Sequence, residues 1–427
     1  MTRLTNWAGN VTFSAARVHR PRSVRQLQQL VAGADRVRAL GTGHSFNSIA
    51  DTPGDLISLA GLPPDFVVDT DRSRVTASGG MTYGQLAPRL HEAGYALANL
   101  GSLPHISVAG ACATGTHGSG DGVGNLATAV AAIALVTADG ELVTLDRDRP
   151  ADQPAFSGAV VGLGSLGVAV GLTLAIEPTY LVSQYVYDDL PTDVLDGHFE
   201  EIFGAGYSVS LFTDWRGGTF NQMWVKRRIA GQDLAAPEPR WLGARLADGP
   251  RHPVPGMSPV YCTEQLGVPG PWHERLPHFR LDFTPSAGRE LQSEFMLPRA
   301  RAVEAIRAIE AISDVVAPVV QISEVRTIAA DELWLSPAYQ RDSVGLHFTW
   351  IDDLAAVTPV LTQVEERLAP LGPRPHWGKL FTVNPAGRYQ RMPEFSELRR
   401  GYDPAGKFGN DFLDAYLTPR RPGSPLR

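Results

Sequence analysis

The sequence predicts a two-domain α+β protein, and two observations support this prediction. First, its 427 residues exceed the length that a single hydrophobic core serves efficiently. Second, strand-like and helix-like segments alternate as far as Glu177-Pro178, whereas the chain from about residue 180 to 375 holds more aromatic side chains and longer amphipathic helices. We expect one domain over residues 1–180, a second over 181–375, and a C-terminal segment, 376–427, that returns to the first domain.

Composition and charge narrow the class of partner. The formal net charge is -7, whereas a protein whose main partner is nucleic acid needs a basic face. No apolar run is long enough for a signal peptide or a membrane span, so we expect a cytoplasmic protein, without membrane or nucleic-acid partners, that acts on a small molecule. Cys112 and Cys262 are too few for a disulfide framework or a cysteine zinc site. We predict no metal centre, and we expect a monomer.

Local patterns place the elements of the first domain. Ser23 and Gln26 form the S-x-x-Q pattern of a capped helix, and Thr82 and Gln85 begin a second helix that Pro88 should kink or shorten. Alternating apolar residues and turn signals predict strands over the other segments: 36–40, 56–59, a hairpin of 66–70 with 73–78, a hairpin over 130–145, and 168–176.

The second domain carries two amphipathic helices. One presents Val303, Ile306 and Ile309 on a single face. Thr358-Pro359 is expected to begin the other, because proline fits the first turn of a helix. Its inward positions are Val360, Leu361, Val364 and Leu368.

Residues 162–167 spell GLGSLG, which satisfies the G-x-G-x-x-G fingerprint of a Rossmann dinucleotide site. That fingerprint requires a helix directly after it, because the pyrophosphate rests on the helix N-terminus. Here the sequence predicts a strand. We therefore reject the Rossmann interpretation.

A long loop over residues 99–120 is almost free of charge and rich in small residues. Its glycines, Gly110, Gly115, Gly118 and Gly120, would allow backbone N–H groups to converge on a phosphate. The alternative is a buried connection rich in glycine and alanine, packed under a sheet. Composition alone leaves both open, although long loops inside compact domains are usually functional.

His44 lies in the turn GTGHSFNS, residues 41–48, directly after a predicted strand. Glycines at a strand end indicate that a ligand approaches the backbone closely. A histidine there either caps the turn or takes part in chemistry, and the turn by itself does not decide between these.

Several stretches together resemble the vanillyl-alcohol oxidase family of flavoproteins, and in particular its alditol-oxidising members. The resemblance begins with GTGHSFN and continues about fifty-five residues later with SLPHISVAGACATGTHGSG. It extends over nearly the whole chain through YSVSLFTDW, VYCTEQLGVPGPWHERLPHF, EVRT, WLSPAY, HFTW and RPHWGK. The fold that it implies is a vanillyl-alcohol-oxidase-type FAD domain of two α+β subdomains, followed by a substrate domain of antiparallel sheet and helices.

The resemblance implies FAD attached covalently through a ring nitrogen of His44 to the flavin 8α-methyl carbon. Neutral imidazole is nucleophilic near neutral pH, which makes this bond chemically reasonable. Cys112 lies inside the glycine-rich run and not at its head, so we expect a single tether. The cofactor-binding residues that the resemblance implies are Gly41, Thr42, Gly43, His44, Ser45, Ser102, Ser107, Gly110, Thr114, Gly115, Thr116, His117 and Ala169.

The substrate face is expected from the second domain. Glu324 and Arg326 are two apart on a predicted strand and share a face, as do His347 and Thr349. The pattern alone equally fits a solvated sheet face with alternating charge. The resemblance favours a polyol site, adds Lys379 and Ser102 to it, and fits the several donors and acceptors that a chain of hydroxyls needs.

The activity that the resemblance implies is oxidation of the terminal CH–OH of an alditol such as xylitol or sorbitol, with O2 reduced to H2O2. Lys379 and Arg326 would be catalytic, with Lys379 moving the proton and Glu324 orienting Arg326, while Glu324, His347, Thr349 and Ser102 bind hydroxyls. Gly101 lacks the Cβ that would shield the flavin from oxygen, although alanine is the residue expected at this position. The alternatives are an aldonolactone oxidase or dehydrogenase, and a flavin- or sugar-binding protein without turnover.

Overall fold

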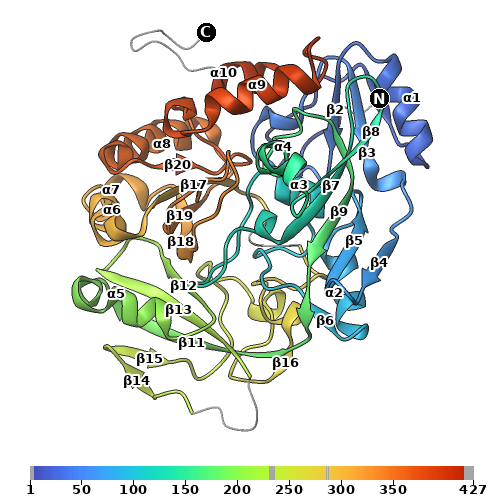
Figure 1. Ribbon diagram of the computed structural model, residues 1–427. Coiled ribbons are helices and arrows are strands. Elements are labelled where there is room, and N and C mark those ends of the chain that lie inside the picture. The colour runs from blue at the N-terminus through green and yellow to red at the C-terminus, as the bar shows by residue number, and fades with distance from the viewer. Residues whose placement is uncertain (1–3, 230–235, 285, 287, 418–427) are drawn as a thin grey trace.

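The computed structural model describes residues 4–229, 236–284, 286 and 288–417. Within these ranges the strands form four sheets, and the elements alternate as the sequence predicts until β10 (Glu177–Pro178). Figure 1 shows the N-terminal sheets on one side of the molecule and one large sheet, flanked by helices, on the other.

A small parallel sheet begins the chain, in the order β1-β3-β2, with β1 over Arg17–His19, β3 over Asp55–Ser58 and β2 over Val37–Leu40. Helix α1 (Val24–Gly33) connects β1 to β2 and buries Leu27 and Val31. Ser23 caps α1 as predicted, since its side chain accepts from the Gln26 N–H. The Gln26 side chain accepts from the Arg22 N–H and not from that of Ser23, so the reciprocal half of the capping box is displaced by one residue.

A five-stranded antiparallel sheet follows, in the order β4-β5-β9-β7-β8. Its strands are β4 (Phe66–Asp69), β5 (Arg74–Ser78), β9 (Val168–Ala175), β7 (Val130–Val136) and β8 (Leu142–Asp146). Both predicted hairpins are present, and β9 follows GLGSLG directly. A strand after that motif confirms the rejection of the Rossmann site.

The helices of this half differ from two sequence expectations. Helix α2 (Tyr83–Glu92) has the full capping box of Thr82 and Gln85, and it continues past Pro88, which therefore does not shorten it. The expected loop over residues 99–120 contains helix α3 (Val108–Ala113). Its sequence, VAGACA, consists of small side chains that do not obstruct a short helix. The remaining elements of this half are β6 (Tyr95–Ala96), which pairs with β10, and α4 (Gln153–Ala159).

The large sheet is antiparallel in the order β14-β15-β11-β13-β12-β18-β19-β17-β20, and β16 pairs with β11 outside this path. Its strands are β11 (Leu181–Pro191), β12 (Ser208–Thr213), β13 (Thr219–Arg228), β14 (Arg240–Trp241), β15 (Ala244–Leu246), β16 (Gly270–Pro271), β17 (Leu291–Pro298), β18 (Val320–Ile328), β19 (Ser343–Trp350) and β20 (Arg374–Pro375). The helices of this part are α5 (Leu195–Gly204), α6 (Ala302–Glu310), α7 (Ser313–Val316) and α8 (Leu354–Leu368). Figure 1 shows these helices on the side away from α2 and β9.

Helix α8 corrects the expected start at Thr358-Pro359. The helix begins at Leu354, because the Asp353 side chain accepts from the N–H groups of Ala355 and Ala356, and Pro359 lies inside it. Its inward face is as predicted, with Val360, Leu361, Val364 and Leu368 buried.

The C-terminal segment packs against the N-terminal half. It contains α9 (Met392–Tyr402) and α10 (Asp411–Tyr416). The Lys407 carbonyl accepts from the Val37 N–H, and buried Phe408 joins the cluster that includes Leu27 and Val31. The Asn410 amide donates to the carbonyls of Ser48, Ile49 and Asp51.

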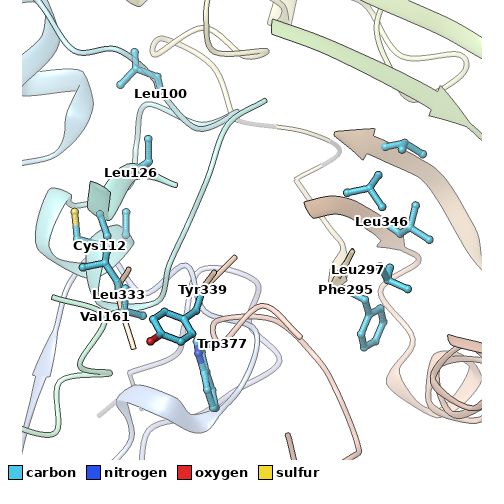
Figure 2. Close-up of a cluster of buried hydrophobic side chains, with 14 of the residues drawn as sticks. Leu100, Cys112, Leu126, Val161, Phe295, Leu297, Leu333, Tyr339, Leu346 and Trp377 are labelled. Atoms are coloured by element: carbon cyan, nitrogen blue, oxygen red, sulfur yellow. The ribbon is translucent and has the colours of Figure 1, made fainter. Parts of the chain in front are cut away.

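The main hydrophobic core joins the two halves. Figure 2 shows Cys112, Leu126 and Val161 from the N-terminal half near Leu333 and Tyr339, with Trp377 from the segment after β20 beside them. Phe295, Leu297 and Leu346 of the large sheet belong to the same cluster. The site described next therefore lies between surfaces that share a packed core.

Candidate active site

One cavity collects nearly all of the predicted site residues. It is lined by residues of the GTGHSFNS turn, of α3 and its flanks, of β9, and of strands β17, β18 and β19. Gly115 is the exception among the predicted residues. It has a left-handed φ of +66° directly after α3, and it faces Pro337 and Val161 outside the cavity, so it serves the backbone turn rather than the cavity wall.

His44 presents a neutral imidazole to this cavity. Its ring stacks on Trp7 with centroids 5.3 Å apart, and Nδ1 lies 3.0 Å from the Thr42 hydroxyl. Burial lowers the pKa of His44 to about 4. Nε2 is buried and has no hydrogen-bond partner among the described residues. A buried ring nitrogen without a partner is costly unless a bound group contacts the ring.

Glycines bring the backbone close to the cavity beside His44. A Cβ at Gly110 would lie 2.7 Å from the Ser107 hydroxyl, and one at Gly41 would meet the same oxygen. At Gly79 and Gly80 a Cβ would meet backbone carbonyls. Only glycine fits this cradle, which leaves room for a ligand against the main chain.

The terminal nitrogens of Arg38, the cation beside the cradle, already donate to backbone carbonyls, whereas its buried Nε has no partner among the described residues. Arg38 lines the cavity, but its guanidinium donates to the carbonyls of Gly164, Phe408, Ile49 and Leu163. A phosphate would therefore be held by N–H and hydroxyl groups, as the sequence indicates for the 99–120 segment. The glycine cradle and the unpartnered nitrogen of His44 fit a flavin nucleotide.

Cys112 is turned away from the cavity. Its side chain is 1% exposed, and its sulfur lies 3.8 Å from the Tyr83 hydroxyl. Burial raises the pKa of this thiol to about 12. Cys112 therefore does not present a reactive thiolate to the cavity.

The opposite wall is a row of polar side chains on three neighbouring strands. His347 of β19 is paired in register with Glu294 of β17 on one side and with Glu324 of β18 on the other. Arg326 and Thr349 follow two residues further along their strands, so their side chains point to the same face. The two predicted pairs therefore share one face, and the solvated-sheet alternative is wrong because these side chains are buried.

Glu294 is the centre of this wall, and the sequence analysis missed it. Its carboxylate is 1% exposed and lies 2.6 Å from Lys379 Nζ, 2.6 Å from Arg326 Nη2 and 3.1 Å from His117 Nε2. Burial would raise the pKa of Glu294, but Lys379, Arg326 and His117 hold it well below its ordinary value. It is the sole acidic residue of β17 (LQSEFMLP), and this was the signal that could have revealed it.

Glu324 contacts Arg326 less closely than expected. Its Oε2 lies 3.5 Å from Arg326 Nε, whereas Glu294 makes the shorter contact, so Glu294 rather than Glu324 is the main orienting partner. The other oxygen of Glu324 lies 2.7 Å from Nε2 of His278, a second cavity residue that sequence reasoning did not select. Arg326 Nη1 also donates to the Ser102 hydroxyl at 3.3 Å.

Lys379 connects Glu294 to His347. Its Nζ lies 2.9 Å from His347 Nδ1, and His347 Nε2 lies 3.1 Å from the Thr349 hydroxyl. Burial and Lys379 together hold the pKa of His347 well below its usual value, so the ring is neutral. Because an ammonium group only donates, Nδ1 accepts from Lys379 and Nε2–H donates to Thr349. Burial and Arg326 lower the pKa of Lys379, and Glu294 opposes them.

The Lys379 segment is fastened directly to the His44 turn. The Phe46 N–H donates to the Gly378 carbonyl at 2.7 Å. The Asn47 amide donates to the carbonyls of Trp377 at 2.8 Å and Lys379 at 2.7 Å. The two walls of the cavity therefore share this junction.

Two kinds of feature were not found in the described ranges. No group of three or more His, Cys, Asp or Glu side chains there has an arrangement that could hold a metal ion. Among the helices that the structure describes, none combines the length and the apolar character needed to cross a membrane.

Comparisons with known proteins agree with this geometry. The family model named FAD binding domain matches residues 15–146, and the model named D-arabinono-1,4-lactone oxidase matches residues 285–416. Cholesterol oxidase from B. sterolicum has the same fold, with a TM-score of 0.77 at 15% identity over 97% of this chain and 96% of its own. A solvent-stable cholesterol oxidase gives a TM-score of 0.79 at 14% identity over 97% of each chain.

Sequence relatives cover the whole of this architecture. The L-gulono-1,4-lactone dehydrogenase of Mycobacterium tuberculosis (strain ATCC 25618 / H37Rv) is 27% identical over 97% of this chain and 99% of its own. The alditol oxidase of Streptomyces sp. (strain IKD472 / FERM P-14339) is 52% identical over 96% of this chain and 98% of its own. With an FAD-binding domain of the vanillyl-alcohol oxidase type and this degree of identity along its length, the chain belongs to the alditol oxidase family.

Proposed function

We propose that this protein oxidises the terminal CH–OH of an alditol, such as xylitol or sorbitol, to the aldose, and reduces O2 to H2O2. The observation that carries the proposal is the shared cavity, in which the buried row around Glu294 and Lys379 faces the glycine cradle beside His44. The alditol oxidase of Streptomyces, at 52% identity, supports the substrate class.

The cofactor of this proposal is FAD, bound covalently through a ring nitrogen of His44. When bound, FAD supplies the two-electron acceptor for the hydride of the alcohol C–H bond and passes the electrons to O2. Ser107, Gly110 and Thr114 would hold it at the cradle, and Ala169 would approach it by its backbone. The unpartnered nitrogen of His44 and its low pKa support the tether.

The polar wall would bind the alditol and manage its proton. Lys379 Nζ and the Arg326 guanidinium bind the reacting hydroxyl and polarise its O–H bond, and Lys379 takes the proton as the C–H bond breaks. The lowered pKa of Lys379 supports this role, because its ammonium group then gives up a proton more easily and forms the amine that accepts the proton of the substrate. Ser102, Glu324, His347 and Thr349 bind the remaining hydroxyls and fix the position of the terminal carbon.

Gly101 would leave a path for oxygen. It lines the cavity directly before Ser102, and a Cβ built on it comes no closer than 3.7 Å to its neighbours. A methyl group therefore fits there, so glycine is not required by packing. This supports a role for the missing Cβ in oxygen access.

Two measurements on the purified protein test the proposal. Acid precipitation should give a yellow pellet, whereas a colourless pellet would remove the covalent tether. H2O2 release should then appear with xylitol and sorbitol and be weaker with glycerol and gulonolactone. Release with gulonolactone alone would instead support the aldonolactone alternative, which the M. tuberculosis relative favours. Yellow protein that is silent with all four would favour a binding protein without turnover.

The expected cytoplasmic location and monomeric state belong to the same proposal. Cell fractionation tests the location, and size-exclusion chromatography with light scattering tests the monomer.

A further inference from the structure

A buried lysine lies behind the substrate wall and belongs to none of the roles assigned above. Lys226 of β13 is 1% exposed and does not line the cavity. Its Nζ donates to the Leu276 carbonyl, to the Pro277 carbonyl at 3.2 Å, and to Nδ1 of His278 at 3.1 Å. An ammonium group has three protons to donate, and these three acceptors use all of them.

This arrangement determines which nitrogen of His278 carries the ring proton. Since Lys226 donates to Nδ1, that nitrogen is an acceptor, and the proton of the neutral ring is on Nε2. Nε2 lies 2.7 Å from Oε1 of Glu324 and can donate to it. The ring is also held in place by edge contacts, with its centroid 5.2 Å from that of Trp224 and 5.5 Å from that of Phe212.

The consequence reaches the substrate. With Oε1 of Glu324 occupied by His278, Oε2 is left for Arg326, 3.5 Å away, and for the open cavity. We infer that Lys226 is a positioning residue, which acts through the tautomer of His278 to fix the ionised carboxylate of Glu324 for a substrate hydroxyl. The substrate part of this inference rests on the proposed function, whereas the tautomer does not.

The charged and titratable groups around His278 give the inference a characteristic pH signature. They are Lys226 and Cys262 on one side, and Glu324 and Arg326 on the other. Burial and Lys226 lower the pKa of His278 to about 4, and burial raises the pKa of Cys262 to about 12, so both are neutral near pH 7. Burial lowers the pKa of Lys226 to about 7, and the negative charge of Glu324 opposes this shift.

Loss of Lys226 should therefore matter most around pH 7, because above this pH Lys226 itself loses the ammonium proton that fixes the tautomer. In Lys226→Met, neutral His278 is free to place its proton on Nδ1, toward the two carbonyls that Lys226 has left, and then Nε2 turns a lone pair to the Glu324 carboxylate. At lower pH the ring gains a second proton more readily, because the repelling ammonium is gone, and Nε2–H again donates to Glu324. The defect should shrink as the pH falls.

Lys407 provides a matched control. Its Nζ also donates to three backbone carbonyls, those of Val31, Ala32 and Ala138, but it contacts no histidine and lies away from the cavity. Lys407→Met therefore removes the same kind of ammonium–carbonyl contact at a half-buried position, with no effect on the His278 tautomer.

The experiment measures kcat/KM for xylitol with the flavin-loaded full chain, from about pH 5.5 to about pH 8.5, where only histidine among unperturbed side chains changes charge. Lys226→Met should lose about 10- to 100-fold around pH 7, as expected for a charge-assisted hydrogen bond, and this loss should shrink toward both the acidic and the alkaline end. Lys407→Met should keep a constant ratio to the unmodified protein. In the double variant Lys226→Met, His278→Gln the recovery at low pH should vanish, because an amide donates to Glu324 without titrating. A constant Lys226→Met ratio across the range would overturn the inference.

A second measurement is independent of turnover. Nitrogen-15 NMR of the histidine rings, with the His278 signal identified by its loss in His278→Gln, should show the neutral Nε2–H tautomer at about pH 6, where Lys226 is charged and His278 is neutral. The Nδ1–H tautomer would overturn the inference, and this reading decides the matter if Lys226→Met does not fold. Absence of turnover by the unmodified protein would count against the proposed function, whereas the tautomer would still be observed.

Discussion

The two walls of the cavity satisfy their polar groups in opposite ways. The wall beside His44 has space for a bound group, because its glycines carry no side chain that would fill it. It also leaves a polar group unsatisfied, since the buried Nε2 of His44 has no partner among the described residues. In the wall around Glu294 the buried charges pair with one another, although Nε2 of His376 has no partner among the described residues. Under the proposed function, the wall beside His44 would hold the cofactor and the wall around Glu294 would bind the substrate.

This difference has an energetic cost on each side. An unfilled cradle leaves buried groups without hydrogen bonds, which a bound cofactor would supply. A buried network of charges is stable only when each member keeps its partners, and removal of one member leaves the others uncompensated. Substitutions on the two walls should therefore fail in different ways.

The largest effect is expected at Lys379. Lys379→Ala should lower kcat about 10²- to 10⁴-fold, the range of a lost general acid–base group, while the protein stays yellow because the opposite wall is intact. Stopped-flow measurement of flavin reduction by xylitol checks this, and Lys407→Ala serves as the control. Near-normal reduction would remove Lys379 from the mechanism.

Glu294→Gln should be the most destabilising change of the polar wall. It removes the negative charge shared by Lys379 and Arg326, and loss of one member of a buried charge network costs about 3–5 kcal/mol. The midpoint of denaturant unfolding should fall accordingly, whereas Glu397→Gln on the exposed side of α9 should leave it unchanged. An unchanged midpoint for Glu294→Gln would show that the wall does not depend on that charge.

Acid should destabilise the protein chiefly through buried neutral histidines. Burial holds the pKa of His278 at about 4 and those of His347 and His376 well below their usual value, whereas the unfolded chain takes up these protons below about pH 6.5. The unfolded state then binds more protons, so stability falls as pH drops below that value, by about 1.4 kcal/mol per pKa unit for each group. Asp331 acts in the opposite direction, since burial raises its pKa to about 6. Thermal unfolding across pH should show a shallower slope for His278→Gln than for the unmodified protein.

His44→Ala should affect attachment more than binding. The glycine cradle remains, so FAD should still bind, but acid should release it and leave a colourless pellet. We expect about a tenfold lower kcat, less than for Lys379→Ala, because the polar wall to which we assign proton transfer is untouched. A yellow pellet from this variant would place the tether elsewhere, and His198→Ala is the matched control.

The smallest effect is expected at Gly101. Gly101→Ala should slow reoxidation by O2 a few-fold, because the new methyl group fits the open space beside Ile106 and Thr116 and narrows the path to the flavin. Reduction by xylitol should be unchanged. Stopped-flow reoxidation at several oxygen concentrations separates the two steps, and equal reoxidation rates would show that oxygen enters another way.

The sequence predicted the cradle better than the polar wall, and the reason is physical. The cradle depends on glycines and His44 within short segments, whose spacing carries the information directly. Glu294 lies on β17, and its partners come from β18 and from the segment after β20, so only the strand order brings them together. Glu324 and Arg326 were paired by their two-residue spacing, yet a neighbouring strand supplies the closer carboxylate.

The errors in the predicted helix boundaries and in the assignment of Gly115 also have physical reasons. Pro359 was expected to begin a helix, and Pro88 was expected to kink or shorten one. Both lie inside helices whose capping residues are further upstream. The side-chain caps Asp353 and Thr82 determine where these helices begin. Gly115 was assigned to the ligand for its place in a glycine-rich run, whereas its positive φ shows that the backbone needs it.

The hydrogen bonds from Phe46 and Asn47 to residues 377–379 have a consequence for biosynthesis. In a newly made chain, the turn that carries His44 and the stretch that carries Lys379 should become ordered together, although some 330 residues separate them. Attachment of the flavin and formation of the proposed proton-transfer site should therefore occur together. A chain truncated before this stretch should fail to retain its flavin.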